Sequence, residues 1–185
     1  TDKLNLSLMS PHNISRGQTA FTVSIDAKKG ISTGISAYDR ACTIKVAIGK
    51  NVTTKDLVSP GHIFPIVAKN GGVLVRAGHT EASVDISKLA KCGPYAVICE
   101  IMNDDGTMAR LPELIDFSKK HNLKIGTVSD LIKYRLKNNK IIKLISERNF
   151  ESEMGKDFKL KIFQNTLSGE KHYALVKNLL ITEDP

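Results

Sequence analysis

An arginine, a glycine, a histidine and a threonine follow one another where an apolar run ends, in the order Arg76-Ala-Gly78-His79-Thr80. The pattern predicts a short strand over 73–75 that leads into a helix capped by Thr80. The free N–H groups and positive dipole of a helix N-terminus attract anions, and a guanidinium can bind a phosphate with two hydrogen bonds. We therefore predict a phosphate site at Arg76, with His79 beside it as a candidate metal ligand.

Two further polar side chains stand at the ends of apolar runs. His62 lies between two prolines in the segment PGHIFP, residues 60–65, and Glu100 closes the run 95–101 before the turn Asn-Asp-Asp-Gly at 103–106. A carboxylate at the end of a buried strand is desolvated, which suits it to general acid or base catalysis. Each signal also has a plain structural reading. His62 could be a hydrogen-bonded structural residue, Glu100 could pair with a lysine, and the Asp side chains could serve only the turn.

These residues need an α+β scaffold to position them. Short apolar or alternating runs predict strands over 19–26, 30–36, 63–68, 73–75, 95–101, 123–128 and 140–145. Helices are predicted to start near Asp39, to run from Thr80 to Ala90, to run from Pro112 to about His121, and to extend from a cap at Ser129 or Asp130 to Arg135. The run 95–101 is continuous enough to be buried on both faces of a sheet.

The last part of the chain has a different character. Residues 151–157 are polar and predict a linker, whereas 158–163 and 172–176 alternate on either side of the turn Leu-Ser-Gly-Glu at 167–170. That arrangement predicts a β-hairpin, and such a hairpin needs a larger sheet to join.

Composition excludes several classes of protein. The 185 residues carry a net charge of +8, but the lysines are scattered and the chain has no Trp, so we expect no nucleic-acid partner. No apolar run is long enough to cross a bilayer and no signal-peptide pattern opens the chain, which predicts a cytoplasmic protein without a membrane partner. The three cysteines lack the spacing of a zinc site and are expected to be reduced packing residues.

The residues alone indicate a phosphate-binding α+β enzyme that uses a His and a Glu for proton transfer, and they leave the reaction open. Four segments in register make the prediction more specific. They are TGISAYDR at 33–40, PGHIFP at 60–65, GGVLVRAGHTEA at 71–82 and CEIMNDDGTMAR at 99–110. Together they resemble the 3,4-dihydroxy-2-butanone 4-phosphate synthases of riboflavin biosynthesis, over residues from about 8 to 135.

The resemblance implies a lyase that converts D-ribulose 5-phosphate to 3,4-dihydroxy-2-butanone 4-phosphate and formate with Mg²⁺ or Mn²⁺, usually as a cytosolic homodimer. It also implies a mixed sheet packed with helices. His62 and Glu100 match the two residues regarded as essential for catalysis in the family. The positions that match its substrate-binding residues are Arg76, Gly78, His79, Thr80 and Glu100, and His79 also matches a metal ligand.

The chain departs from the family pattern in one respect. The family carries an upstream acidic loop that supplies a carboxylate ligand to the metal, and this chain contains no such loop. Because hard divalent ions need several oxygen ligands, His79 alone would bind a metal weakly. The chain starts at Thr1 without a Met, so we expect a fragment, a truncated gene product or a renumbered part of a longer chain. The alternative to an enzyme is a non-catalytic remnant that only dimerises or supports a partner domain.

The tail has a resemblance of its own. Residues 158–163 and 172–177 are similar to the first hairpin of GTP cyclohydrolase II, which follows the synthase in bifunctional riboflavin enzymes. The zinc-binding cysteines, catalytic residues and GTP-binding residues of that enzyme are absent, so we expect no GTP hydrolysis by this chain. We therefore predict a partial synthase-like domain over 1–137, a linker over 138–157 and the start of a cyclohydrolase-like domain over 158–185.

Overall fold

A computed structural model describes residues 2–14, 17, 19–152 and 155–177 of the chain. The α-helices are α1 (Ala37–Ala47), α2 (His79–Leu89), α3 (Leu111–Lys120) and α4 (Val128–Asn138). Short 3-10 helices cover η1 (Asp2–Leu4), η2 (Thr54–Asp56) and η3 (Gly72–Leu74). The strands are β1 (Ala20–Phe21), β2 (Ile25–Ala27), β3 (Leu57–Ile63), β4 (Ile66–Val67), β5 (Ile142–Ser152), β6 (Gly155–Asn165) and β7 (Lys171–Lys177). The predicted α+β class is confirmed.

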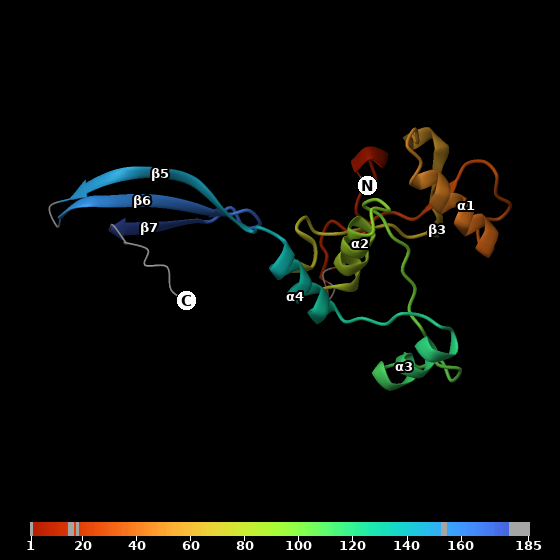
Figure 1. The fold of residues 1–185 in the computed structure, drawn as a ribbon. Coiled ribbons are helices and arrows are strands. Elements are labelled where there is room, and N and C mark those ends of the chain that lie inside the picture. Colours follow the sequence, from red (N-terminus) through yellow and green to blue (C-terminus); the bar gives the residue numbers. More distant parts are fainter. Residues whose placement is uncertain (1, 15–16, 18, 153–154, 178–185) are drawn as a thin grey trace.

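The strands form three separate antiparallel sheets rather than a single mixed sheet. β1 pairs with β4, β2 pairs with β3, and β5, β6 and β7 form a sheet in that order. In Figure 1 the first two pairs lie near α1 and α2, while the three-stranded sheet extends away from them beyond α4. The molecule is therefore elongated, with the predicted phosphate loop and His62 in the part before α3.

The β2–β3 pair positions His62. The register shifts between Ile25 and Asp26, so Ile25 faces Ile63 while Asp26 faces Val58. Gly61 lies so close to the backbone of Ile25 that a Cβ atom there would overlap it. A glycine at this position lets β3 approach β2 closely, and it places His62 next to Asp26.

Two strands predicted in the first half of the chain are not formed. Residues 30–36 make bends because Gly30 and Gly34 have φ angles of +81° and +90°, which are incompatible with a strand. Residues 73–75 contribute to the 3-10 helix η3, where the Val73 N–H donates to the Asp85 carboxylate at 2.9 Å instead of to a neighbouring strand. The predicted strand over 19–26 is divided into β1 and β2, and that over 63–68 into the end of β3 and β4.

The two most apolar predicted strands are also absent. Residues 95–101 and 123–128 are coil, apart from the first turn of α4 at Val128, and Val97 and Leu123 have exposed fractions of 69% and 56%. A strand needs a neighbouring backbone to accept its hydrogen bonds, and among the described residues no strand edge lies alongside these runs. The apolarity of these two runs therefore did not predict their burial.

The helices follow the predicted starts more closely. Ser36 caps α1 by accepting a hydrogen bond from the Asp39 N–H at 3.0 Å, and Pro112 lies in the first turn of α3 as predicted. α4 begins earlier and ends later than predicted, because Thr127 is the cap and accepts from the Asp130 N–H at 3.1 Å. The cap of α2 is Gly78, so the prediction of Thr80 as the cap is wrong.

The C-terminal hairpin is confirmed and has a third strand. β6 and β7 pair from Phe158↔Lys177 to Gln164↔Lys171 around the predicted turn, and β5 pairs with the other edge of β6. β5 continues to Ser152 and β6 begins at Gly155, so the prediction of a polar linker over 151–157 is wrong for its described residues, which are strand. β5 thereby supplies the additional strand that the isolated hairpin lacked.

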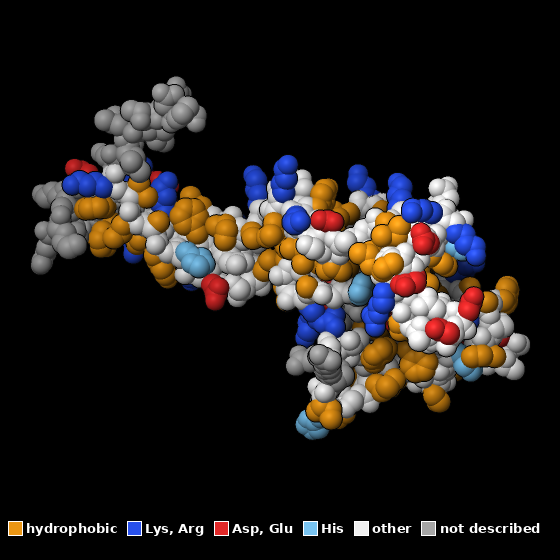
Figure 2. Space-filling model, turned by 90° about the horizontal axis from the view of Figure 1, so that it is seen from below, with side chains coloured by type: hydrophobic (Ala, Val, Ile, Leu, Met, Phe, Trp, Pro, Cys, Tyr) orange, Lys and Arg blue, Asp and Glu red, His pale blue; other side chains and the backbone are white. Residues whose placement is uncertain are grey.

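Burial is concentrated in the first half of the chain and is unusually polar. The buried apolar residues among those described are Leu4, Ile25, Ala27, Val73 and Ala82, and the buried polar ones are Thr22, Asp26, Asp39, Thr43, Thr80, Glu81 and Asp85. Figure 2 shows hydrophobic side chains exposed along the whole length of the molecule. No helix in the described part of the chain has the length and apolarity to span a membrane.

Candidate active site

His62 is held by a buried carboxylate. Its Nδ1 lies 2.7 Å from Oδ2 of Asp26, and its backbone N–H donates to Oδ1 of the same residue at 3.0 Å. The Asp26 side chain is 9% exposed and that of His62 is 38% exposed. The imidazole is therefore fixed on one side and accessible on the other.

Arg76 is also tied to a buried carboxylate. Its Nη1 donates to Oε2 of Glu81 at 2.5 Å, and Glu81 is only 1% exposed. Its Nη2 donates to the Gly17 carbonyl at 2.8 Å and to Thr19 Oγ1 at 3.2 Å. Two of the five guanidinium N–H groups remain, one on Nε and one on Nη1. Both two-bond arrangements of a guanidinium use an N–H of Nη2, whose two N–H groups already donate to Gly17 and Thr19, so the predicted grip on phosphate requires Arg76 to release one of these partners.

The loop between Arg76 and α2 brings the predicted phosphate residues together. A Cβ atom on Gly78 would collide with Nη1 of Arg76 and lie 2.8 Å from Oε2 of Glu81, so glycine is required here by the close approach of this ion pair. Gly78 makes no side-chain cap, which leaves first-turn N–H groups of α2 without that partner. His79 is exposed and Thr80 is buried at the start of the helix.

A second buried ion pair joins α2 to α4. Nη1 of Arg135, on α4, lies 2.5 Å from Oδ2 of Asp85, on α2, and the two side chains are 14% and 4% exposed. Asp85 also accepts from the Val73 N–H. The Asp85 carboxylate therefore joins α2, which begins at the predicted phosphate loop, to α4 and η3.

The segment 32–39 lies against the His62 pair. Asp39 accepts from the Gly34 N–H at 3.0 Å and from Ser32 Oγ at 2.8 Å. The Ser32 hydroxyl, followed by backbone N–H groups, holds the pKa of Asp39 below its usual 3.8. A Cβ on Gly34 would overlap the Asp26 carboxylate and lie 2.6 Å from Nδ1 of His62. The loop therefore covers the Asp26 side of the pair.

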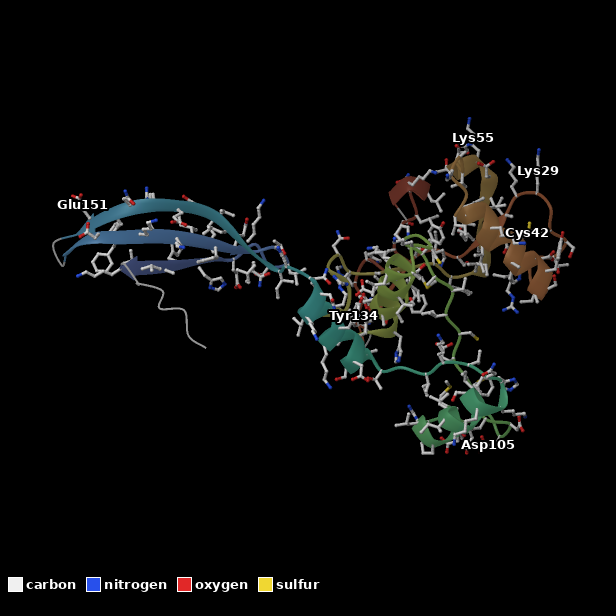
Figure 3. All side chains as sticks on the ribbon, in the orientation of Figure 1. Lys29, Cys42, Lys55, Asp105, Tyr134 and Glu151 are labelled. Atoms are coloured by element: carbon white, nitrogen blue, oxygen red, sulfur yellow. The ribbon has the colours of Figure 1, made fainter. Side chains whose placement is uncertain are left out.

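Glu100 is not brought to these residues. It is exposed, lies in coil, and its side chain makes no hydrogen bond or ion pair with the described residues. In Figure 1 the coil after α2 runs away from β3 towards α3, and Figure 3 places Asp105, from the following turn, beside α3. The predicted buried strand end is thus an exposed coil, and the desolvation argument for Glu100 does not hold in this arrangement.

The described residues supply only part of a metal site. No group of three or more His, Cys, Asp or Glu side chains among them is arranged to hold a metal ion. His79 offers one nitrogen, whereas Mg²⁺ and Mn²⁺ prefer several oxygen ligands. A divalent ion does not fit these residues by themselves, and no reaction step is assigned to it.

Two hollows lie near the site region but differ in their relation to it. A hollow of about 240 Å³ is lined by Gly17 and Thr19, the two residues that contact Nη2 of Arg76, together with Leu8, Met9, Ser10, Asn13, Ala20 and Phe21. A hollow of about 500 Å³ is lined by residues that include Lys29 and Lys55, which Figure 3 shows near α1 and away from α3. The smaller hollow is the one connected to a predicted site residue.

Sequence reasoning missed the carboxylates that hold the site. Asp26 and Glu81 were assigned no site role, although each is a charge inside a segment otherwise expected to be buried, which is a usable signal. The thiols also differ from expectation, because Cys42 is half-buried but Cys92 and Cys99 are exposed rather than packed.

The sequence pattern of the family described as 3,4-dihydroxy-2-butanone 4-phosphate synthase matches residues 1–134. The chain belongs to this family. It is 48% identical over 184 residues to the synthase of Pseudomonas aeruginosa, covering 100% of this chain and 50% of the relative. It is 50% identical over 186 residues to the riboflavin biosynthesis protein RibBA of Aquifex aeolicus, covering 100% of this chain and 46% of that protein. The chain therefore spans about half the length of the curated relatives it matches.

Solved structures of synthases of this family have the same fold. The two-domain synthase RibBX of A. baumannii is 45% identical, with a TM-score of 0.81, and the match covers 96% of this chain and 52% of that one. A synthase solved in complex with two magnesium ions is 34% identical, with a TM-score of 0.67, over 75% of this chain and 69% of that one. The magnesium ions belong to that structure.

Proposed function

We propose that this chain carries part of the active site that converts D-ribulose 5-phosphate to 3,4-dihydroxy-2-butanone 4-phosphate and formate. The observation that carries the proposal is the family match over residues 1–134, within which His62 and Arg76, the residues that the motif resemblance assigns to catalysis and substrate binding, are each fixed by a buried carboxylate. Side chains held in this way are preorganised for catalysis and binding.

Arg76 and the start of α2 would bind the substrate phosphate. The guanidinium would release an Nη2 partner, Gly17 or Thr19, to grip the phosphate with two hydrogen bonds, and the uncapped first turn of α2 adds backbone donors beside it. Gly78 adds no side chain next to Arg76 and Glu81, and His79 and Thr80 follow it at the start of α2. The neutralising carboxylate of Glu81 limits the net charge at the site, so binding relies on directed hydrogen bonds as well as on charge.

His62 and Glu100 would perform the proton transfers. The reaction needs a proton removed next to a ketone, loss of a hydroxyl group, a skeletal shift and release of formate, and positioned acid–base groups serve such steps. His62 is already positioned by Asp26. Glu100 lies in coil here, so its role requires that the segment 95–101 be ordered against residues that this chain does not supply.

We further propose that the complete enzyme uses Mg²⁺ or Mn²⁺, with His79 as one ligand and carboxylates of an acidic loop as the others. The metal would polarise the neighbouring oxygens of the sugar. A homodimer, a cytoplasmic location and a division into a synthase-like part over 1–137 and a cyclohydrolase-like part over 158–185 belong to the same proposal. The connecting segment 138–157, predicted as a linker, contains β5 and the start of β6 and so belongs with the C-terminal sheet. The match to RibBA over the whole of this chain supports the bifunctional arrangement.

Formate release from ribulose 5-phosphate tests the function. The chain as given should release no formate even with excess Mg²⁺, because the described residues hold no complete set of metal ligands. A version extended at its N-terminus by the acidic loop of the Pseudomonas aeruginosa relative should release formate. Turnover by the chain alone would show that the metal ligands have been misplaced, and failure of the extended version in both Mg²⁺ and Mn²⁺ would count against the synthase proposal.

The exposed apolar runs favour a second candidate, a non-catalytic remnant that dimerises or supports a partner. Val97 and Ile125 are 69% and 50% exposed, and such surface is usually covered by another chain or segment. Under this reading the extended version folds and self-associates but releases no formate. Ultracentrifugation and the formate assay on the same sample separate the two candidates.

A further inference from the structure

Asp26 has no role in the motifs that identify the family reaction, yet it makes the most specific contact of the candidate site. It lies on β2, is 6% exposed, and meets His62 through both of its carboxylate oxygens. Its only ionic partner in the described part of the chain is His62. A buried carboxylate is costly unless it is paired, so this arrangement needs a reason beyond stability.

The geometry points to Asp26 as the positioning residue that makes His62 a base through its Nε2 atom, an inference that rests on the proposed function. An ionised carboxylate only accepts hydrogen bonds, so the hydrogen between Oδ2 and His62 belongs to Nδ1. The neutral ring then carries its lone pair on Nε2, which makes no hydrogen bond with the described residues. The backbone contact at Oδ1 prevents the carboxylate from rotating away.

The loop 32–39 packs against the Asp26–His62 pair. Gly34 has a φ of +90° and lies against both Asp26 and His62, where any side chain would overlap the carboxylate. Asp39 and Ser32 hold that loop in place. The conspicuous segment TGISAYDR, which had no assigned chemistry, thereby covers the Asp26 side of the pair and leaves the far side of the ring accessible.

Proton transfer through this pair is balanced. The Nε2 lone pair takes a proton from the carbon next to the ketone. The electrons of the broken C–H bond form a C=C bond, the carbonyl π electrons move onto the oxygen to give an enediolate, and the ring becomes an imidazolium with a hydrogen on each nitrogen. The Asp26 carboxylate stays ionised and faces the new positive charge. The proton later returns from Nε2 to the substrate, which restores the starting tautomer.

The first test measures the tautomer without any assay of activity. Nitrogen-15 NMR of the His62 ring in the unmutated chain should show hydrogen on Nδ1 and a free lone pair on Nε2. In Asp26→Asn the amide oxygen can keep the backbone hydrogen bond while the amide NH₂ now donates to Nδ1, so the hydrogen should move to Nε2. Hydrogen on Nε2 in the unmutated chain, or an unchanged tautomer in the variant, would overturn the inference.

The matched control is Asp39→Asn. It changes a carboxylate that is equally buried and holds the same loop, but that makes no hydrogen bond with His62. It should lower the unfolding temperature and leave the His62 tautomer as it was. A tautomer change in this control would mean that the loop, and not Asp26, sets the ring.

The second test measures turnover in the extended version. Asp26→Asn should lower kcat at least about a hundredfold while KM for ribulose 5-phosphate changes less than about threefold, because a wrong tautomer in a carboxylate–histidine pair removes the base and leaves binding intact. A rise in KM with unchanged kcat would overturn the positioning role. The proposed function fails separately, if His62→Ala keeps full activity, whereas the tautomer results stand or fall independently of that outcome.

Discussion

The two halves of the predicted catalytic pair are organised in opposite ways. His62 and the neighbouring Arg76 loop are held by the buried carboxylates of Asp26 and Glu81, whereas Glu100 lies in an exposed coil with no side-chain partner among the described residues. The first half is built from contacts between segments that are all present in this chain. The second half depends on a strand that has no described partner. His62 and Arg76 are therefore preorganised because the segments that contact them are present, and Glu100 is not because its segment has no partner strand among the described residues.

The largest expected effect comes from removing the Asp85 carboxylate, which pairs with Arg135 and accepts from the Val73 N–H. Asp85→Ala would leave Arg135 largely buried without its partner and should destabilise the chain by about 3–5 kcal/mol. Asp104→Ala is the control in the exposed coil that contains Glu100. Its side chain is exposed, so the change should alter the unfolding free energy by less than about 0.5 kcal/mol. Urea unfolding of both variants measures the contrast, and equal effects would remove it.

The catalytic pair itself gives the second contrast. His62→Ala and Glu100→Gln should each reduce formate release in the extended version at least about a hundredfold, as expected for loss of positioned acid–base groups. Glu100→Gln should leave the unfolding temperature of the chain as given unchanged, because Glu100 makes no side-chain contact there. Full activity in either variant would refute that residue's role, while loss of folding in His62→Ala would favour a structural role for it.

A substitution of Arg76 tests its predicted role in binding the substrate phosphate. Arg76→Ala should weaken binding of the phosphorylated substrate by about 1.5–3 kcal/mol, the usual range for a charge-assisted contact. KM for ribulose 5-phosphate in the extended version is the measurement. Lys88→Ala, an exposed lysine in the last turn of the same helix, is the control for loss of a positive charge. The phosphate assignment is wrong if the two variants have the same KM as the unmutated protein.

A polar substitution in the exposed segment 95–101 tests whether that segment becomes buried in the complete protein. Val97→Ser should change the stability of the chain as given by less than about 0.5 kcal/mol, because Val97 is 69% exposed. In the extended version the same change should cost about 1–3 kcal/mol if the segment 95–101 becomes a buried strand. Equal costs in the two proteins would show that the missing segment does not cover this run.

The smallest expected effect is a loss of stability in acid as Asp39, which holds the loop 32–39, becomes protonated. The pKa of Asp39 is lowered below 3.8 by the Ser32 hydroxyl and neighbouring N–H groups. A lowered pKa in the folded state gives stability that is complete above the unfolded value and is lost as the pH falls through the folded one. Unfolding temperatures measured downwards from pH 5 should therefore fall more in the unmutated chain than in Asp39→Asn. A parallel fall in both would assign the acid sensitivity to other carboxylates.

Local signals were sufficient wherever the deciding contacts are close in sequence. Pro112 marked the start of α3, the turn at 167–170 marked the β6–β7 hairpin, and the helix start predicted near Asp39 lies within two residues of the first residue of α1, Ala37. Local signals failed for 73–75, where the left-handed conformations of Gly71 and Gly72 and the Asp85 carboxylate took the backbone out of a strand. The pattern gave no information about which distant carboxylate would accept the Val73 N–H.

The sequence by itself determined the α+β class, the family and the candidate site residues, because motif order and residue type are properties of the chain alone. Only the tertiary structure decided that Asp26 holds His62 and that Glu81 holds Arg76, since these contacts depend on the approach of β3 to β2 at Gly61 and of Arg76 to α2 at Gly78. It also decided that the most apolar run is exposed. Apolarity states what a segment gains from burial, and a neighbouring backbone decides whether that burial occurs.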